Sequence, residues 1–211
     1  MYTHEKKIIT RGKPLSETGK ALILVHGRGA TAESILNLAP ELDASDFTLF
    51  APQATQHSWY PYSFMAPVAQ NQPALDSALK LLETTVTEIE NQGIPSQQIY
   101  FAGFSQGACL TAEFACRNAR NFGGLLIFTG GLIGQEINPT NYKGNFEGTP
   151  VFISTGNPDP HVPVSRVEET VQILTEKGAQ VTKRIYPGRP HTINQEEINL
   201  AKKLLAGEKL S

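Results

Sequence analysis

The sequence predicts a single α/β domain in which a mostly parallel central sheet carries helices on both faces. Short, continuous apolar runs alternate along the chain with segments of helical periodicity, the pattern of buried strands joined by crossover helices. The 211 residues suit one domain that can bury a large core. No internal repeat or low-complexity linker divides the chain, so we expect one domain over residues 1–211.

The expected strands are the apolar runs, taken in chain order. After a short leading strand within residues 5–11, buried strands are expected over residues 21–25, 47–51, 99–102, 124–128, 150–154 and 181–186. Pro52 is expected to end the strand at 47–51, and residues 156–160 to form the turn after the strand at 150–154. Because these strands are mostly parallel, ligands are expected beyond their carboxyl ends, at one edge of the sheet.

The segments between the strands have helical spacing. Helices are expected over residues 31–39, 75–89, 106–118, 163–177 and 194–206. Thr31 is expected to cap the first of these helices and Pro40 to stop it. Residues 53–73 have no period but carry several aromatic residues and prolines. Two interpretations of this segment stay open: a packed wall beside the active site, or an aromatic patch that only covers the core.

Composition and charge exclude several function classes. The net charge of −2, with both signs interspersed, gives no electrostatic footprint for nucleic acid or an anionic membrane. No apolar run approaches the roughly 18 residues that span a bilayer, and residues 1–7 precede no signal-peptide apolar region. We therefore expect a cytoplasmic protein without stable membrane insertion. Cys109 and Cys116 lie on one expected helix with Cα atoms roughly 10 Å apart, too far for a disulfide.

The pentapeptide Gly103-Phe104-Ser105-Gln106-Gly107 lies between the expected strand at 99–102 and the helix that follows it. A G-x-S-x-G pattern in this position is typical of the nucleophile elbow, the strained strand-to-helix turn that exposes a catalytic serine. The pattern alone is weak evidence, because a chain with 18 glycines can contain it in an ordinary turn. The rest of the chain must therefore supply the partners that a nucleophilic serine needs.

A serine hydroxyl needs a histidine as base and a carboxylate that orients the histidine. Asp159 and His191 both follow expected strands, and they come after Ser105 in the order serine, acid, histidine. The other aspartates are less suitable, because Asp43 and Asp46 precede a strand and Asp76 begins a helix. Glu136 and Glu147 stay as alternative acids, although they lie in a polar surface segment. Among the other histidines, His4 is expected to be exposed, and His57 lies in the irregular segment.

The transition state of acyl transfer needs backbone N–H donors for the developing oxyanion. We expect one donor from Gln106, at the N-terminus of the helix, and one from Arg28, in the glycine-rich loop after the strand at 21–25. The alternative is that these glycines only make a tight turn and that Arg28 is an exposed charge. His26 is expected to support this loop by hydrogen bonding. The expected substrate-binding residues are His26, Gly27, Trp59 and His161.

Several motifs in register resemble one family: Leu24-Val25-His26-Gly27-Arg28-Gly29, Gly103-Phe104-Ser105-Gln106-Gly107, Thr129-Gly130-Gly131, Gly156-Asn157-Pro158-Asp159-Pro160-His161-Val162-Pro163 and Pro190-His191. From about residue 20 the chain resembles the phospholipase/carboxylesterase family, the small branch of α/β-hydrolases that includes acyl-protein thioesterases. The resemblance implies an α/β-hydrolase fold without a large cap domain and a Ser105–His191–Asp159 triad. It also implies an oxyanion hole from the backbone of Arg28 and Gln106, with no metal or organic cofactor. The related dienelactone hydrolases use a cysteine nucleophile, so the chain differs from them.

Two departures concern the substrate. Thioesterase members resemble H-G-L-G-D after the first buried strand, where this chain has His26-Gly27-Arg28-Gly29-Ala30. They also tend to carry an acidic residue after the loop tryptophan, where this chain has Trp59-Tyr60-Pro61-Tyr62. An arginine in this place could favour an anionic acyl or leaving group, or could point to solvent.

We expect a serine carboxylesterase that hydrolyses small-to-medium carboxylic esters through an acyl-enzyme on Ser105. One alternative is a lysophospholipase or acyl-protein thioesterase that acts on long acyl chains. Another is a catalytically inactive hydrolase fold that serves as a receptor or interaction module. The expected partner is a small-molecule ester. The sequence leaves the oligomeric state open, and a homodimer is kept as an alternative because dimers are common in families of this kind.

Overall fold

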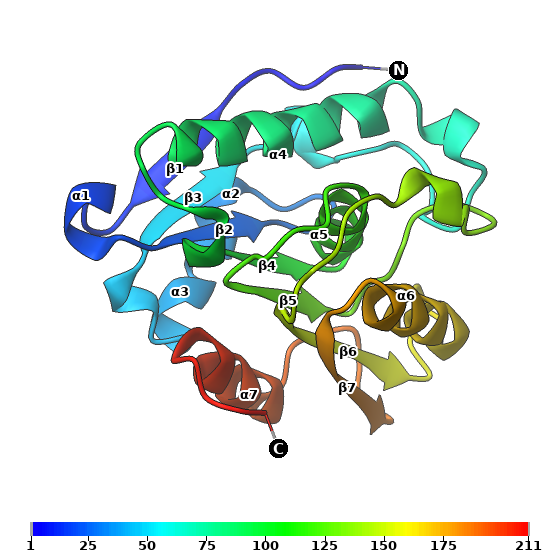
Figure 1. Ribbon diagram of the computed structural model, residues 1–211. Helices are drawn as coiled ribbons and strands as arrows, with labels where there is room; N and C mark the ends of the chain where they lie inside the picture. The colour runs from blue at the N-terminus through cyan, green and yellow to red at the C-terminus, as the bar shows by residue number, and fades with distance from the viewer. Residues whose placement is uncertain (1, 211) are drawn as a thin grey trace.

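The computed structural model describes residues 2–210 and contains a seven-stranded sheet with helices on both faces (Figure 1). The strands are β1 (Ile8–Arg11), β2 (Ala21–Val25), β3 (Thr48–Pro52), β4 (Ile99–Phe104), β5 (Gly124–Phe128), β6 (Pro150–Asn157) and β7 (Gln180–Pro187). Their order across the sheet is β1-β3-β2-β4-β5-β6-β7. Strand β1 pairs antiparallel with β3, and the remaining neighbours pair in parallel. The carboxyl ends of β2–β7 therefore share one edge, as predicted.

The helices lie in two layers. They are α1 (Leu15–Thr18), α2 (Ala32–Leu36), α3 (Leu38–Glu41), α4 (Ala74–Glu90), α5 (Gln106–Arg117), α6 (Val164–Glu176) and α7 (Gln195–Leu205). Short 3₁₀ turns complete the connections: η1 (Ala44–Asp46), η2 (Thr55–His57), η3 (Val68–Asn71), η4 (Ser96–Gln98) and η5 (Pro139–Asn141). Helices α4, α5 and α6 cover one face of the sheet, whereas α2, α3 and α7 cover the other.

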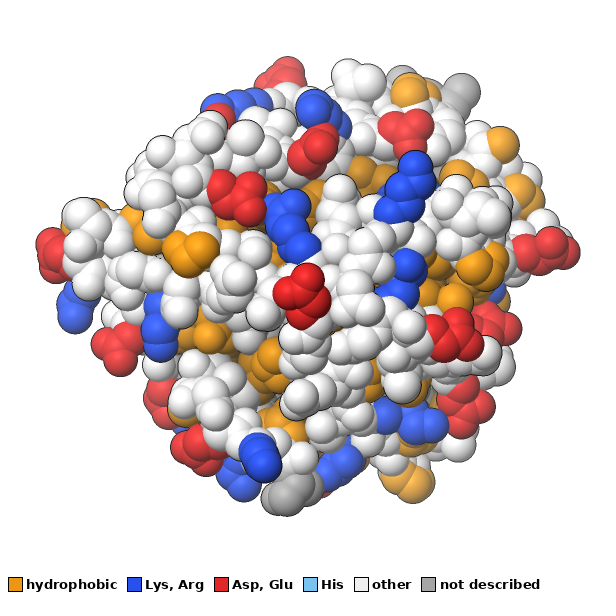
Figure 2. Space-filling model, viewed as in Figure 1, with side chains coloured by type: hydrophobic (Ala, Val, Ile, Leu, Met, Phe, Trp, Pro, Cys, Tyr) orange, Lys and Arg blue, Asp and Glu red, His pale blue; other side chains and the backbone are white. Residues whose placement is uncertain are grey.

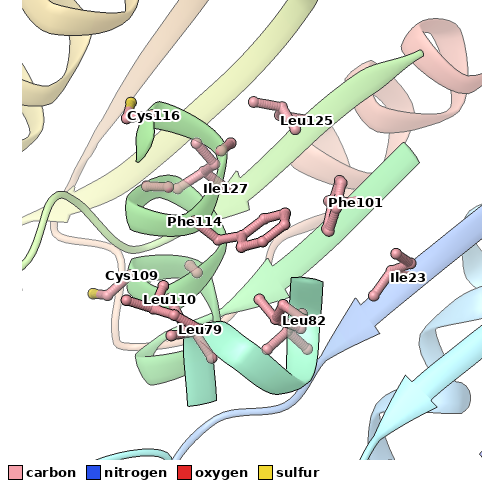
Figure 3. Packing of buried hydrophobic residues seen from close by; sticks show 14 of the residues in the cluster. Ile23, Leu79, Leu82, Phe101, Cys109, Leu110, Phe114, Cys116, Leu125 and Ile127 are labelled. Atoms are coloured by element: carbon pink, nitrogen blue, oxygen red, sulfur yellow. The ribbon is translucent and has the colours of Figure 1, made fainter. Parts of the chain in front are cut away.

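Alternate strand residues face the two helical layers, because side chains along a strand point in turn to opposite faces. Ile23, Phe101 and Leu125 pack toward α4 and α5, where Phe101 contacts Phe114 with 5.7 Å between the ring centres (Figure 3). Residues of the same strands one position away belong to the other core, among them Leu24. Both faces of the central strands are therefore buried, which explains why these strands are continuous apolar runs.

Three boundaries differ from the sequence-based expectation. The segment 31–39 is divided into α2 and α3 at Asn37, and Pro40 lies inside α3. A proline is tolerated there because the amide groups of a first helical turn have no intrahelical acceptor. Pro52 is the last residue of β3, where β2 no longer pairs with the strand, so its missing N–H costs no ladder bond. Strand β6 continues to Asn157 because β7 pairs with it that far.

Two local expectations, the cap at Thr31 and the buried cysteines, are confirmed. Thr31 caps α2, since its side chain accepts from the Ser34 N–H. Cys109 and Cys116 are buried free thiols on α5. No helix within residues 2–210 is long and apolar enough to cross a membrane. Basic and acidic side chains are interspersed over the face that Figure 2 shows, in keeping with the small net charge.

Candidate active site

Ser105 occupies a sharp turn between β4 and α5, with φ of 54° and ψ of −119°. A positive φ is strained for a residue with a side chain, and such strain is typical of functional positions. The flanking glycines make the turn sterically allowed. A Cβ atom on Gly103 would lie 2.5 Å from the Gly107 carbonyl oxygen, and one on Gly107 would lie 2.0 Å from the Val25 carbonyl oxygen. Both positions therefore require glycine. In a chance occurrence of the G-x-S-x-G pattern, the two glycines would have no such steric requirement.

The structure brings Ser105, His191 and Asp159 into a continuous hydrogen-bonded chain. The Nε2 atom of His191 lies 2.8 Å from the Ser105 Oγ, and its Nδ1 lies 2.9 Å from the Asp159 Oδ2. A carboxylate can only accept, so Nδ1 carries the hydrogen and Nε2 is free to accept the serine hydroxyl hydrogen. The three side chains come from the loops after β4, β6 and β7, at the edge of the sheet where the sequence predicts them.

The environment of Asp159 favours its ionised form. Its side chain is fully buried, and burial alone would raise the pKa of the carboxyl. The hydrogen bond with His191 and the N–H groups of His161 and Val162, each 2.9 Å from Oδ1, outweigh burial and lower that pKa below its usual value. The carboxylate is thus charged at neutral pH and can orient the imidazole. The ring of His191 also contacts the rings of Phe104 and His161, at 5.2 and 5.1 Å between centres.

A buried polar network, absent from the sequence-based expectation, fixes the loop that carries His191. Arg189 donates to the Thr129 Oγ1 at 2.7 Å, and its Nε lies 3.6 Å from the Glu197 carboxylate. Glu197 is fully buried and also accepts from Ser154 at 2.5 Å and from the Asn194 N–H at 2.8 Å. The network joins the loop to β5, β6 and the start of α7. The capping-box pattern Asn194-x-x-Glu197 is the sequence signal that could have indicated part of this network.

The loop after β2 lies directly against the serine. A Cβ atom on Gly27 would contact the Ser105 Cβ at 3.5 Å. The loop is held by two backbone hydrogen bonds, from Gly29 N–H to the His57 carbonyl at 2.7 Å and from Ala30 N–H to the Gly27 carbonyl at 3.2 Å. Within the described residues, the N–H of Arg28 donates no hydrogen bond to another protein group. Gln106 begins α5, so its N–H also lacks an intrahelical acceptor.

Residues 58–64, which we call the aromatic wall, pass beside the cavity next to Ser105, and residues 60–64 of this segment line it. The cavity has a volume of about 710 Å³. It is lined by Gly27, Arg28, Ala30, Tyr60, Pro61, Tyr62, Ser63, Phe64, Phe104, Ser105, Gln106, Cys109, Pro160, His161, Val162 and His191. This placement favours the first interpretation of the irregular segment, a wall beside the site. Cys109 also lines the cavity, but burial raises the pKa of its thiol to about 12, which keeps it a neutral thiol.

Trp59 and His26 lie behind the lining of the cavity, which corrects the expectation that they contact substrate. Both are fully buried. The Trp59 ring lies between the rings of His4 and His26, at 5.4 and 4.9 Å between centres, and its Nε1 donates to the His26 carbonyl at 2.8 Å. His4 is half-buried against this segment and is not exposed as expected. Gly27 and His161 line the cavity, in agreement with their predicted positions.

Two polar side chains attach the aromatic wall to the rest of the site. The Gln106 amide accepts from the Trp59 N–H at 2.9 Å and donates to the Tyr60 carbonyl at 2.8 Å. The Arg28 guanidinium donates to Ser58 Oγ and to the carbonyls of Pro61 and Tyr62. The two residues expected to supply backbone oxyanion donors therefore also hold the wall with their side chains.

Comparison with known proteins agrees with this architecture. A family model described as phospholipase/carboxylesterase matches residues 7–207. The chain is 29% identical over 171 residues to acyl-protein thioesterase 1 of Eremothecium gossypii, covering 79% of this chain and 70% of that protein. It is 29% identical over 154 residues to a probable carboxylesterase of Oryza sativa subsp. japonica, covering 69% of this chain and 56% of that one.

Solved structures extend the comparison. A phospholipase/carboxylesterase from Dyadobacter fermentans DSM 18053 is 62% identical, with a TM-score of 0.96 over 98% of this chain and 99% of that one. The predicted α/β-hydrolase fold without a large cap domain is confirmed, and so is the predicted family. The family model and the names of the relatives indicate that this chain is a carboxylesterase-type hydrolase that acts on esters or thioesters. The chain belongs to the phospholipase/carboxylesterase family.

Proposed function

We propose that this chain is a serine carboxylesterase that hydrolyses small-to-medium carboxylic esters through an acyl-enzyme on Ser105. The hydrogen-bonded chain from Ser105 through His191 to Asp159 carries the proposal. It has the roles that acyl transfer needs: a nucleophile, a base in contact with it, and a carboxylate that orients the base.

Ser105, His191 and Asp159 each have a defined task in the first half of the reaction. As the Ser105 Oγ attacks the ester carbonyl carbon, its proton passes to the His191 Nε2. Asp159 stays ionised, holds the Nδ1–H and stabilises the imidazolium that forms. His191 then gives the proton to the departing alkoxide, so the alcohol leaves and the acyl group stays on the serine. In the second half, His191 removes a proton from the water that attacks the acyl carbon. His191 then gives this proton to the departing Ser105 Oγ, so the acid is released and the serine hydroxyl is restored.

The backbone N–H groups of Arg28 and Gln106 are the proposed donors to the oxyanion of both tetrahedral intermediates. Arg28 follows Gly27, on which a Cβ atom would lie 3.5 Å from the Ser105 Cβ, and Gln106 follows Ser105 directly, so both proposed donors lie near the reacting centre. Loss of one such donor typically slows acyl transfer by about 10²–10³-fold. The free amides and the close loop support this assignment.

The cavity volume of about 710 Å³ lies in the range of small-molecule sites, and its aromatic lining suits the acyl part of an ester. A second candidate is hydrolysis of long-chain acyl thioesters, because several relatives are named acyl-protein thioesterases. A series of p-nitrophenyl esters from acetate to palmitate separates the two. The carboxylesterase proposal expects kcat/KM to peak at short or medium chains, and a maximum at palmitate would favour the second candidate.

Replacement of the nucleophile tests the proposal directly. Ser105→Ala should lower kcat for p-nitrophenyl butyrate by at least about 10⁴-fold and abolish labelling by a fluorophosphonate probe. Ser63→Ala is the matched control, because Ser63 lines the same cavity and should keep most of the activity. Unchanged turnover in Ser105→Ala, with native circular dichroism, would contradict the proposal. Absence of labelling in the unaltered chain would favour an inactive receptor instead.

A further inference from the structure

The Arg28 guanidinium is held firmly at the mouth of the cavity. Its Nη1 donates to the Ser58 Oγ and the Pro61 carbonyl, each at 2.9 Å, and its Nη2 donates to the Tyr62 carbonyl at 2.6 Å. The guanidinium carbon also lies 5.9 Å from the centre of the Tyr60 ring. These contacts fix the orientation of a side chain that is otherwise exposed.

Neutral groups accept all three of these hydrogen bonds, so the charge of Arg28 is not balanced by a carboxylate. Within residues 2–210, no Asp or Glu side chain forms an ion pair with Arg28. No acidic residue lines the cavity either, and the lining residues beside Arg28 that can become cationic are His161 and His191. A permanent positive charge thus lines a cavity that has no acidic residue in its lining and is largely apolar.

Arg28 also retains the donors that an anion would use. A guanidinium has five N–H groups, and the three hydrogen bonds leave the Nε–H and one Nη2–H free of protein acceptors among the described residues. Two N–H groups on neighbouring nitrogens match the two oxygens of a carboxylate or phosphate. Because the bonds to the aromatic wall already fix the guanidinium, an anion would bind without the usual cost of ordering a long side chain.

We propose that Arg28 forms an anion-recognition subsite and that the preferred substrates are esters bearing a carboxylate or phosphate group in the acyl or the alcohol part. This inference rests on the proposed esterase function and adds the substrate class to it. The backbone N–H of Arg28 serves the oxyanion while its side chain selects the anionic substrate. One residue therefore couples recognition to the reacting centre.

Two matched pairs of esters test the subsite and identify which part of the substrate carries the charge. Monoethyl glutarate and ethyl valerate differ by a terminal carboxylate in place of a methyl group on the acyl side. Carboxymethyl butyrate and ethyl butyrate differ in the same way on the alcohol side. At low ionic strength we expect kcat/KM for the anionic member of one pair to exceed its neutral partner by about tenfold or more. Added salt should reduce this preference, because salt screens an exposed charge.

Variants of Arg28 link the preference to its side chain. Arg28→Met should bring the anionic-to-neutral ratio of kcat/KM to one or below, and Arg28→Lys should give an intermediate ratio because a lysine keeps the charge but not the fork. The ratio is the informative quantity, since loss of the bonds to the wall would lower the rates of both esters. Arg11→Met is the control, because Arg11 is an exposed arginine on β1 that pairs with Glu33.

The possible results are distinct. A preference of the unaltered protein for the neutral member of both pairs would overturn the subsite while leaving the esterase function standing. An unchanged ratio in Arg28→Met would do the same. If none of the four esters is hydrolysed in a Ser105-dependent manner, the proposed function fails and the subsite fails with it.

Discussion

The two sides of the cavity are built in different ways. On one side, the elbow at residues 103–107 is positioned by backbone: Gly103 packs on Gly107, and Gly107 packs on the carboxyl end of β2. On the other side, the aromatic wall has no regular structure, and side chains from distant parts of the chain hold its backbone. Arg28, Gln106 and His4 supply these bonds.

Under the proposed function, this difference separates the part of the site that performs chemistry from the part that selects substrate. The elbow cannot move without disturbing β2 and β4, which suits a nucleophile that must keep its geometry. The aromatic wall can change its sequence while its anchors remain, which suits a surface that decides specificity. The comparison predicts that damage to the elbow affects the whole fold, whereas damage to an anchor has smaller and more local effects.

The largest effect is expected for Gly107→Ala. The new Cβ atom would lie 2.0 Å from the Val25 carbonyl oxygen and 2.5 Å from that of His26, so β2 and α5 must separate. We expect the free energy of unfolding to fall by more than about 4 kcal/mol, as measured by urea denaturation. The control is Gly93→Ala, at φ of 86° with nothing within 4 Å of its Cβ, where strain alone should cost about 1–2 kcal/mol. Equal losses in the two variants would contradict the proposed rigidity of the elbow.

The same difference explains what the sequence could predict. The strands, the elbow and the order of Ser105, Asp159 and His191 follow from local patterns, because apolar runs and glycine turns are determined by residues near one another. The loops that carry these three residues follow parallel strands, and the carboxyl ends of parallel strands lie at the same edge of the sheet. Prediction of the strands is therefore enough to place the three loops close together.

The aromatic wall could not be predicted in this way. Its position depends on hydrogen bonds between residues far apart in sequence, such as those from the Trp59 N–H to Gln106 and from Arg28 to the Tyr62 carbonyl. A tryptophan in an irregular segment can line a cavity or support it from behind, and local pattern does not separate the two. Likewise, the contact between Arg189 and Glu197 joins a loop to a helix and has no periodic signal beyond the helix cap.

An intermediate effect is expected for Gln106→Ala. The variant keeps the backbone N–H at this position but removes the buried acceptor of the Trp59 N–H and one of the two donors to the Tyr60 carbonyl, which keeps its hydrogen bond from Ser58. We expect a loss of about 2 kcal/mol in the free energy of unfolding, together with lower kcat/KM as the aromatic wall shifts.

Gln70→Ala serves as its control. Gln70 is exposed on the same irregular segment, so its replacement should change the free energy of unfolding by less than about 0.5 kcal/mol. A variant at position 106 that is as stable as this control would show that the side chain of Gln106 does not anchor the wall.

The smallest effect is expected when the pH is lowered. Protonation of His4 and His26 should then reduce the free energy of unfolding, and both residues lie on the side of the cavity that carries the aromatic wall. His26 accepts from the Ala54 N–H through Nε2, and His4 accepts from the Thr55 N–H through Nδ1, while the other ring nitrogen of each faces a carbonyl. Each imidazole therefore fits as one neutral tautomer. Burial lowers the pKa of both histidines from the ordinary value of about 6.5, although hydrogen bonds to backbone carbonyls partly offset it.

The sign of the pH dependence follows from these directions. Below about pH 6.5 the unfolded chain binds protons at His4 and His26 that the folded chain excludes, so the free energy of unfolding should fall as the pH is lowered. The slope of that free energy between pH 6.5 and 5 should be reduced in His26→Asn and in His4→Asn, and further in the double variant. If the double variant has the same slope as the unaltered protein, His4 and His26 do not cause the acid sensitivity. The two sides of the cavity would then not differ in their response to pH.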